Sequence, residues 1–203
     1  MARINVLSGQ VHGMVDWITS DHRELGMFLR TTPDRESTRC VLRGPEVERL
    51  LSNGAIQKGM LVTAHGAMSA RCQRRHDDGS WMAEMLCQAD RVVAESAVEG
   101  RMRGSLHVNL KGVVMYWEPS TLQMKTYFNP EPGVQEDKVT CSVHLRSWLV
   151  GMSESSRERF LSMVRVGREF TLSSLVQLTC YRTKTGDTVP SMMLLPTDFK
   201  LQS

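Results

Sequence analysis

Apolar and polar residues alternate along the segment from Met60 to Cys72. The even positions are Met, Val, Ala, Gly, Met, Ala and Cys, whereas the odd positions are mostly polar. The same parity returns between Phe170 and Cys180, where the even positions are again mostly apolar. A period of two is typical of a β-strand that turns one face to a core and the other to solvent. The pattern therefore predicts a half-buried strand in each half of the chain, with the same face buried.

The first half predicts three strands, one helix and two further strands, in that order. The helix begins at Gly44-Pro45-Glu46, where proline suits the first turn and the acidic side chain suits the positive end of the helix dipole. It ends at Asn53-Gly54. Asp78-Gly79 is a hairpin-turn signal between the last two strands. The strands are expected at residues 5–15, 25–32, 39–43, 60–73 and 80–89.

The second half predicts the same order of elements. Its helix is expected at residues 154–164, and the turn Lys184–Asp187 joins its last two strands. Its strands are expected at residues 107–117, 122–128, 138–145, 169–181 and 188–195.

Short blocks of sequence recur in the same order in both halves. Lys58–Thr63 resembles Val166–Thr171 at an offset of 108 residues. The same offset pairs Cys72 with Cys180. Further matches are Asp90 with Asp198, Cys40 with Cys141, Glu48–Ser52 with Glu158–Ser162, and Leu7–Val11 with Leu110–Val114. We interpret the chain as two tandem units, residues 1–95 and 105–203, joined by a polar linker at 96–104.

The repeated order of elements predicts an all-β fold made of two tandem OB-fold barrels. Each would be a five-stranded Greek-key barrel with one helix between its third and fourth strands, where the helix closes the end of the barrel. A sandwich of short strands is the alternative. The single helix at the same place in each unit favours the barrel.

Scattered residues of the first unit resemble the bacterial single-stranded DNA-binding protein and its smaller relative, primosomal replication protein N. The matching positions are Asn5–Val11, Lys58-Gly59, Gly66, Arg71, Asp78-Gly79, Glu84 and Ala89-Asp90. The second unit is more divergent and keeps Gly112, Gly167, Gly186 and Asp198. The resemblance covers most of residues 3–93, and most of the matches are glycines and turn residues.

The resemblance implies binding of single-stranded DNA with little sequence preference, in DNA replication, repair or transfer, including that of a mobile element. In that family four OB units act together, so a two-unit chain is expected to form a homodimer. The family's long acidic tail does not follow Phe199–Ser203, so recruitment of other replication proteins through a tail is not expected. A protein-interaction module that does not bind nucleic acid and an RNA-binding protein are the alternatives.

Single strands are held by cations along the phosphates and by flat side chains on which bases stack. Residues of these types gather on the predicted strands and hairpin tips of both units. The candidates are Phe28, Arg30, Arg39, Arg43, Arg71, Arg74, Arg75, Trp81, Lys125, Tyr127, Arg146, Trp148, Tyr181, Arg182 and Lys184. Each group has an alternative interpretation. The strand arginines could solvate an exposed sheet face, the charges at residues 74–78 could neutralise one another, and the aromatic residues could pack in the core. For Trp17, Trp117 and Trp148, packing is favoured over stacking on bases, although Trp148 stays among the candidates.

Composition narrows the remaining classes of function. The net charge is +3 and charged residues make up 23% of the chain, so the whole-chain charge does not identify a nucleic-acid binder. Five cysteines without paired spacing argue against a disulfide framework, and buried thiols are expected. The histidines and cysteines lack metal-ligand spacing, and no catalytic or phosphate-binding motif is present, so we expect no metal, no cofactor and no enzyme. The first residues do not resemble a secretory signal, so a cytoplasmic location is expected.

Overall fold

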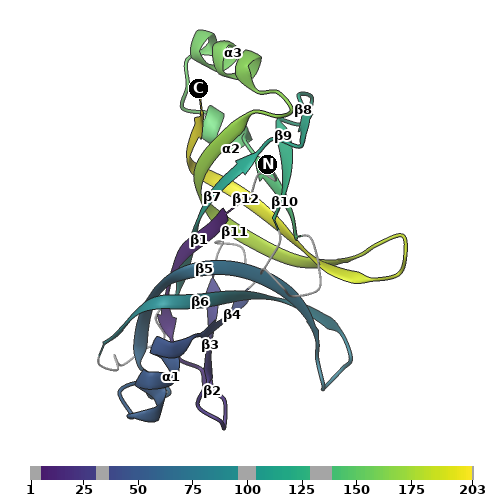
Figure 1. Ribbon diagram of the computed structural model, residues 1–203. Coiled ribbons are helices and arrows are strands. Elements are labelled where there is room, and N and C mark those ends of the chain that lie inside the picture. The colour runs from purple at the N-terminus through teal and green to yellow at the C-terminus, as the bar shows by residue number, and fades with distance from the viewer. Residues whose placement is uncertain (1–5, 31–36, 96–103, 129–138, 203) are drawn as a thin grey trace.

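The computed structural model describes residues 6–30, 37–95, 104–128 and 139–202 (Figure 1). We call residues 6–95 the first half and residues 104–202 the second half. Most of the predicted linker at 96–104 lies outside the described residues. Within the described part, no helix is both long enough and apolar enough to cross a membrane.

The first half contains the elements that the alternation pattern predicts, with one additional short strand. Its elements are β1 (Val6–Met14), β2 (Trp17–Ile18), β3 (Glu24–Arg30), β4 (Ser37–Arg43), α1 (Pro45–Ser52), β5 (Leu61–Arg74) and β6 (Trp81–Glu95). The second half follows the same order, with an extra short helix. Its elements are β7 (Ser105–Val113), β8 (Tyr116–Glu118), β9 (Gln123–Phe128), β10 (Val139–His144), α2 (Arg146–Leu149), α3 (Glu154–Met163), β11 (Glu169–Arg182) and β12 (Thr188–Leu201). The all-β fold class is confirmed.

The strand pairings of the first half give the ring order of an OB fold. β1 pairs with β5, β5 with β6 and β3 with β4, all antiparallel, and β4 pairs with β6 in parallel. β2 follows β1 after only two residues and pairs with β3. The β1–β2 segment therefore contacts β5 at one end and β3 at the other, which closes the ring. The second half has the same pairings among β7 to β12.

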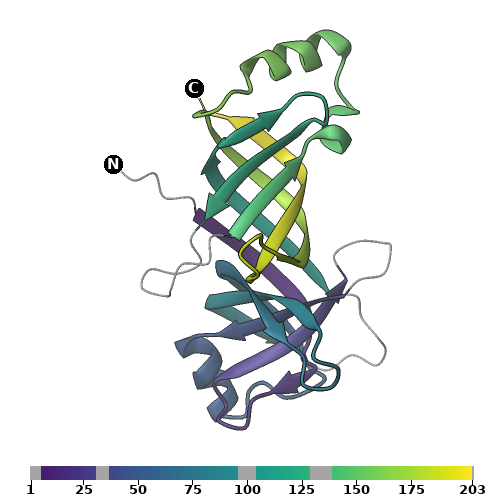
Figure 2. The ribbon, with the colours of Figure 1, turned by 90° about the vertical axis from the view of Figure 1, so that its right-hand side faces the viewer.

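One antiparallel ladder between β1 and β7 joins the two halves into a twelve-stranded sheet. The sheet order β2-β3-β4-β6-β5-β1-β7-β11-β12-β10-β9-β8 reads as the same sequence of equivalent strands from either end. The β5–β6 ladder shifts register between His65 and Gly66, and the β11–β12 ladder shifts at the equivalent place between Ser173 and Ser174, with the extra residue in β6 and in β12. The halves lie one above the other, with α1 and α3 at opposite ends of the molecule (Figures 1 and 2).

The registers correct two of the matches between the halves. Val15 donates its backbone N–H to Met60, and Val114 donates to Arg168 in the same way, so Val114 is the counterpart of Val15. Gly13 is therefore the counterpart of Gly112, and the match of Leu7–Val11 with Leu110–Val114 is wrong by four residues. In the last strands, Arg91 is the counterpart of Asp198, because His65 pairs with Arg91 as Ser173 pairs with Asp198. The match of Asp90 with Asp198 is therefore wrong by one residue.

Gly9 has a packing role at the centre of the molecule. Gly9 pairs with Val108, and Val108 is also the residue that corresponds to Gly9 in the second half. The approximate two-fold axis that relates the halves therefore passes through this pair. A Cβ on Gly9 would collide with the carbonyl oxygen of His107 and with the side chain of Met68. Gly9 thus permits the close approach of β1 and β7.

The equivalence of Cys72 and Cys180 is confirmed, but the expectation of buried thiols is wrong for both. They form a disulfide with a Cα–Cα distance of 6.0 Å. Two equivalent residues bond to each other only where the approximate two-fold axis brings them together, and sequence spacing does not show that axis. Cys40, Cys87 and Cys141 are buried free thiols, as expected.

Each half has an apolar interior that is closed by a helix. In the first half, α1 buries Val47 and Leu51 against this interior. In the second half Phe160 of α3 packs edge-on against Trp148, with a centroid separation of 4.9 Å. Trp148 also lies 5.6 Å from the ring of Phe199. This aromatic cluster gives Trp148 a packing role at the end of the second barrel.

Candidate nucleic-acid interface

A row of polar and aromatic side chains crosses the outer face of the first barrel. Phe28 of β3 is opposite Arg39 of β4, Arg39 is opposite Glu84 of β6, and Glu84 is opposite Arg71 of β5. The neighbours of Phe28 in β3 are fully buried, whereas Phe28 is 48% exposed. Alternation of the strand therefore puts Phe28 on the solvent side as a flat apolar surface.

Arg39 stacks on an aromatic ring that comes from β2. Its guanidinium carbon lies 4.6 Å from the ring centroid of Trp17, within the range of a cation–π contact. Trp17 pairs with Gly26 of β3, and a Cβ on Gly26 would overlap the indole. The absence of a side chain at Gly26 therefore lets the indole lie against the backbone of β3.

A buried carboxylate holds the two arginines of this row. Glu84 has no exposed side-chain surface, and its two oxygens lie 2.7 Å from Arg39 Nε and 2.8 Å from Arg71 Nε. With its amide oriented to donate, Gln73 also reaches both oxygens at 2.8 Å. The side chains of Arg39 and Arg71 remain 23% and 40% exposed, so they keep access to solvent on the outer face. Two cations on one anion leave this cluster with a net positive charge.

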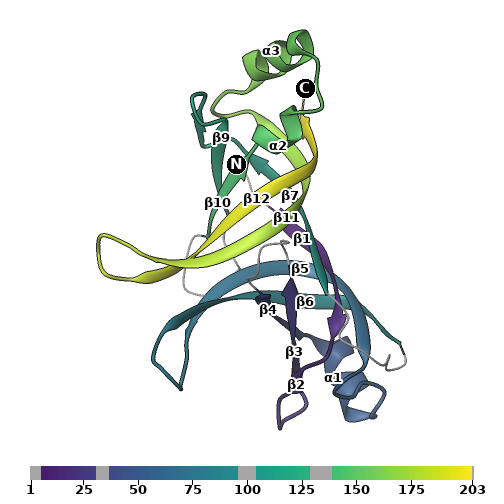
Figure 3. The same cartoon turned by 180° about the vertical axis from the view of Figure 1, so that it is seen from behind.

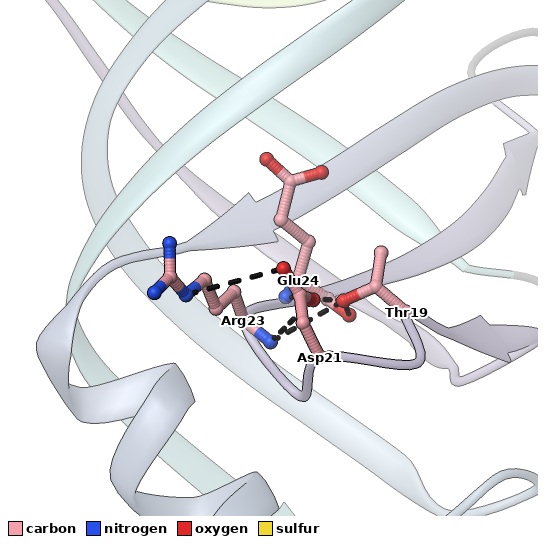
Figure 4. A network of polar contacts seen from close by, with 4 residues as sticks. All are labelled: Thr19, Asp21, Arg23 and Glu24. Carbon is pink, nitrogen blue, oxygen red and sulfur yellow. Dashed lines mark hydrogen bonds and ion pairs between the residues drawn. The ribbon is translucent and has the colours of Figure 1, made fainter.

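A hydrogen-bonded turn borders this face where β2 leads into β3 (Figure 4). Thr19 Oγ1 accepts from the backbone N–H groups of Arg23 and Glu24 and donates to the carbonyl oxygen of Glu24. Asp21 accepts from the Arg23 N–H, and hydrogen bonding with Thr19 is the largest of the effects that lower the pKa of Asp21. These bonds order the loop between the first and second barrel strands, which is a ligand-binding loop in OB folds.

The second barrel carries an equivalent aromatic–cation pair. Tyr116 of β8 is the counterpart of Trp17, and the ammonium of Lys125 lies 5.5 Å from its ring centroid. Tyr127, the counterpart of Phe28, is 40% exposed. Hydrogen bonding to Glu118 at 2.8 Å orients the Tyr116 hydroxyl and raises its pKa.

The ionic row of the first barrel has no equivalent in the second. The counterparts of Arg39, Glu84 and Arg71 are Thr140, Ser191 and Thr179, because these residues occupy the same register positions. The cation in the second barrel therefore comes from the strand of the exposed aromatic residue itself. The two faces share an aromatic residue, a stacked cation and an exposed ring, with the cation supplied by different strands.

The β5–β6 and β11–β12 hairpins, here called the first and second hairpins, project to the same side of the molecule (Figures 1 and 3). Arg74 Nε donates to the carbonyl oxygen of Gly79 at 3.0 Å, and Arg182 Nε donates to Gly186 at 3.2 Å. Each arginine thus supports the tip of its own hairpin. The tip of the first hairpin contains both signs of charge, at Arg75, His76, Asp77 and Asp78.

An open groove of about 830 Å³ lies between the two hairpins. Arg74 and Trp81 line it from the first hairpin, and Cys180, Tyr181 and Arg182 line it from the second. Trp81 is 51% exposed and Tyr181 is 42% exposed, so flat surfaces from both hairpins are accessible. Arg75 is exposed near the first tip and Lys184 in the second.

Two of the candidate residues are placed away from these surfaces. Trp148 belongs to the aromatic cluster at the end of the second barrel, where packing explains its position. Arg146 is exposed at the start of α2, beside that cluster. Arg43 is half-buried on the same side of β4 as Arg39, opposite Glu24 of the turn that borders the face. The side chain of Arg30 lies outside the described residues.

Trp17 and Tyr116 are the residues that sequence reasoning missed. Trp17 was expected to be a packing residue, and Tyr116 was not selected. Trp17 lies two residues after Val15, and Tyr116 lies two residues after Val114, so one offset of 99 residues relates both pairs. Aligning the chain on Val15 and Val114 would have paired the two aromatic residues. The incorrect match of Gly9 with Gly112 hid that signal.

Comparison with known proteins gave similarity to solved structures only. No protein-family model matches the chain, and no curated protein matches it. The single-stranded DNA binding protein from Thermus aquaticus aligns with 12% identity and a TM-score of 0.49, over 99% of this chain and 95% of that chain. A deletion mutant of that protein aligns with 14% identity and a TM-score of 0.49, over 100% of this chain and 97% of that chain. Rim1, a mitochondrial single-stranded DNA binding protein from S. cerevisiae, aligns with 14% identity and a TM-score of 0.30, over 48% of this chain and 94% of that chain.

Proposed function

We propose that this protein binds single-stranded DNA with little sequence preference. The observation that carries the proposal is the recurrence of one arrangement on both barrels. Trp17 with Arg39 and Tyr116 with Lys125 are stacked aromatic–cation pairs, each on the outer face of its barrel. Aromatic residues stack with any base and cations attract any phosphate, so this combination suits an unpaired strand of arbitrary sequence.

The exposed ring beside each pair supplies a further stacking surface. Phe28 and Tyr127 project from the second barrel strand, which belongs to the face that binds oligonucleotides in OB folds. Burying such a ring against the protein would stabilise the fold, yet both remain at least 40% exposed. Their exposure is more useful for binding a ligand than for packing.

The proposed contact residues therefore lie on two barrel faces and two hairpins. Aromatic residues provide stacking, and Arg71, Arg75 and Lys184 join the stacked cations in contacting phosphates. The groove-lining residues Arg74, Trp81, Tyr181 and Arg182 complete the proposed set on the hairpins. In the cell this activity would serve replication, repair or transfer of DNA.

We also propose that the two halves arose by tandem duplication, with units at residues 1–95 and 105–203. The shared order of strands and the equivalent bulges support this proposal.

A homodimer, which the resemblance to the bacterial single-stranded DNA-binding protein implies, would bring four barrels together. Sedimentation equilibrium should then give twice the mass of one chain, and a monomer mass at micromolar concentration would reject the dimer.

Fluorescence anisotropy with a labelled thymidine oligonucleotide of about 30 residues tests the proposal. We expect micromolar or tighter binding at low salt. With about five phosphate contacts, raising the salt from roughly 50 to 200 mM should weaken binding roughly 100-fold, because counterions are released on binding. The replacement of both Arg75 and Lys184 by alanine should reduce the salt dependence.

The same experiment separates the alternatives. An RNA oligonucleotide of equal length that competes better than DNA would identify an RNA-binding protein. An absence of binding to either polymer at low salt would reject the proposed function and favour a protein-interaction module.

A further inference from the structure

The Cys72–Cys180 disulfide lies where the two hairpins leave the barrels. Cys72 pairs with Ala83 and Cys180 pairs with Pro190 inside their own hairpins. The neighbouring strand β4 pairs with β6 only from Glu84 onward. In the second half, β10 likewise pairs with β12 only from Ser191 onward. Beyond these points, the strand pairs of the described residues join each hairpin only to itself.

The disulfide therefore joins two arms at their bases. Elsewhere the halves are held by the ladder between β1 and β7. β1 pairs with β5 as far as Ala67, and β7 pairs with β11 as far as Leu175. Cys72 and Cys180 lie five residues further along each strand than those last pairs. The disulfide is thus a covalent link between the arms beyond the barrels, and β6 also lies close to β11, as β5 does to β12.

The spacing of the arms defines the inter-hairpin groove. Cys180 itself lines the groove of about 830 Å³, together with Trp81 of the first hairpin and Tyr181 of the second. An aromatic ring and an arginine from each hairpin face the same space only while the two hairpins keep this separation. Two binding surfaces held in place bind one strand more tightly than two that move independently, because less conformational entropy is lost on binding.

The other three cysteines are poorly suited to thiol–disulfide exchange. Burial raises the pKa of Cys87 and of Cys141 to about 12. Burial also raises the pKa of Cys40 well above its ordinary value. The thiolate is the reactive form, so these residues are protected, whereas Cys72 and Cys180 are only half-buried. A reductant would therefore act selectively on the bond between the hairpins.

We propose that the Cys72–Cys180 disulfide is a redox-controlled clasp that forms a single-stranded DNA groove between the hairpins. This inference rests on the proposed function. With the bond intact, the groove-lining rings and arginines bind one segment of the strand between the two barrel faces. With the bond reduced, the hairpins move independently and this segment is released.

The chemistry is a two-electron exchange with a dithiol reductant. A thiolate of the reductant attacks one sulfur of the disulfide, which forms a mixed disulfide and releases the other cysteine as a thiolate. The second thiol of the reductant then attacks the mixed disulfide and becomes part of an oxidised reductant. Two protons from the reductant's thiols convert Cys72 and Cys180 to thiols. Oxidation by a disulfide of the same class reverses the exchange.

The test compares oxidised protein with protein reduced by dithiothreitol. We expect the affinity for a labelled 30-residue thymidine oligonucleotide to fall roughly five- to tenfold on reduction at constant salt. Iodoacetamide labelling of the native protein should modify Cys72 and Cys180 after reduction and should leave the three buried cysteines unmodified. The double variant Cys72→Ser/Cys180→Ser should bind as the reduced protein does and should not respond to dithiothreitol.

A second variant keeps the test independent of folding effects. Trp81→Ala/Tyr181→Ala leaves the disulfide in place but removes the rings of the groove, so its affinity should change little on reduction. Equal affinity of the oxidised and reduced wild-type protein, with circular dichroism showing that both are folded, would overturn the clasp and leave the proposed function standing. Failure of both forms to bind the oligonucleotide would overturn both inferences. A native protein in which iodoacetamide labels Cys72 and Cys180 without any reductant, even after oxidation, would also overturn the clasp.

Discussion

Replacing Glu84 by glutamine is expected to lower the free energy of unfolding by about 2–4 kcal/mol. Glu84 is fully buried, and its carboxylate is the anion for both Arg39 and Arg71. Removing one member of a buried ion pair leaves the other members without compensation. The expected loss lies somewhat below that of a fully buried pair, because both arginines are partly exposed and remain hydrated. Urea-induced unfolding followed by circular dichroism measures the change.

The second barrel supplies a matched control for this variant. Ser191 occupies the register position of Glu84 but carries no charge and is opposite Thr140 and Thr179. Ser191→Ala should therefore change the free energy of unfolding by less than about 0.5 kcal/mol. Equal losses for the two variants would show that the ionic row does not stabilise the first barrel. A stable Glu84→Gln protein would also contradict the role assigned to the carboxylate.

Replacing Phe28 and Tyr127 together by alanine is expected to weaken binding of the thymidine oligonucleotide by at least roughly 30-fold. Stacking is worth about 1–3 kcal/mol per base, and one ring is lost from each barrel face. Both residues lie on the outer face and are only about half buried, so their removal should cost less stability than the loss of a core ring. Anisotropy at constant salt measures the loss, and each single variant should account for a part of it.

An exposed apolar residue away from the interface provides the control for the aromatic variant. Val150 is 80% exposed beside α2, at the end of the second barrel. Val150→Ala should leave the affinity unchanged within about twofold, because no stacking surface is removed. If Phe28→Ala/Tyr127→Ala binds as tightly as the wild type, the barrel faces are not the binding site.

The period-two pattern indicated the fold class because most of the long strands, such as β1, β7, β11 and β12, bury alternate residues. The parity of Met60–Cys72 and of Phe170–Cys180 matches the strands β5 and β11. Turn and helix signals such as Pro45 and Gly79 act locally, so they gave the helix and the hairpin tip at the observed places. Contacts between the halves depend on the β1–β7 ladder, which no local signal in the sequence encodes.

The candidate interface was predicted in part for the same physical reason. Phe28 and Tyr127 were found because alternation distinguishes the outer from the inner side of a strand. Arg39 can stack on Trp17 because the residue opposite Trp17 in the neighbouring strand is Gly26, which has no side chain. Only the strand register shows that Gly26 is opposite Trp17. Trp148 was selected by residue type alone, and its packing partners come from distant segments.

The most direct test of the central claim is to map where a bound strand lies. The complex with a bromodeoxyuridine-substituted oligonucleotide is irradiated, digested and analysed by mass spectrometry to locate the crosslinked residues. We predict crosslinks on both barrel faces, at β2 and β3 around Trp17 and Phe28 and at β8 and β9 around Tyr116 and Tyr127. Crosslinks confined to the polar face of β1 and β7, or found on one barrel only, would contradict the account.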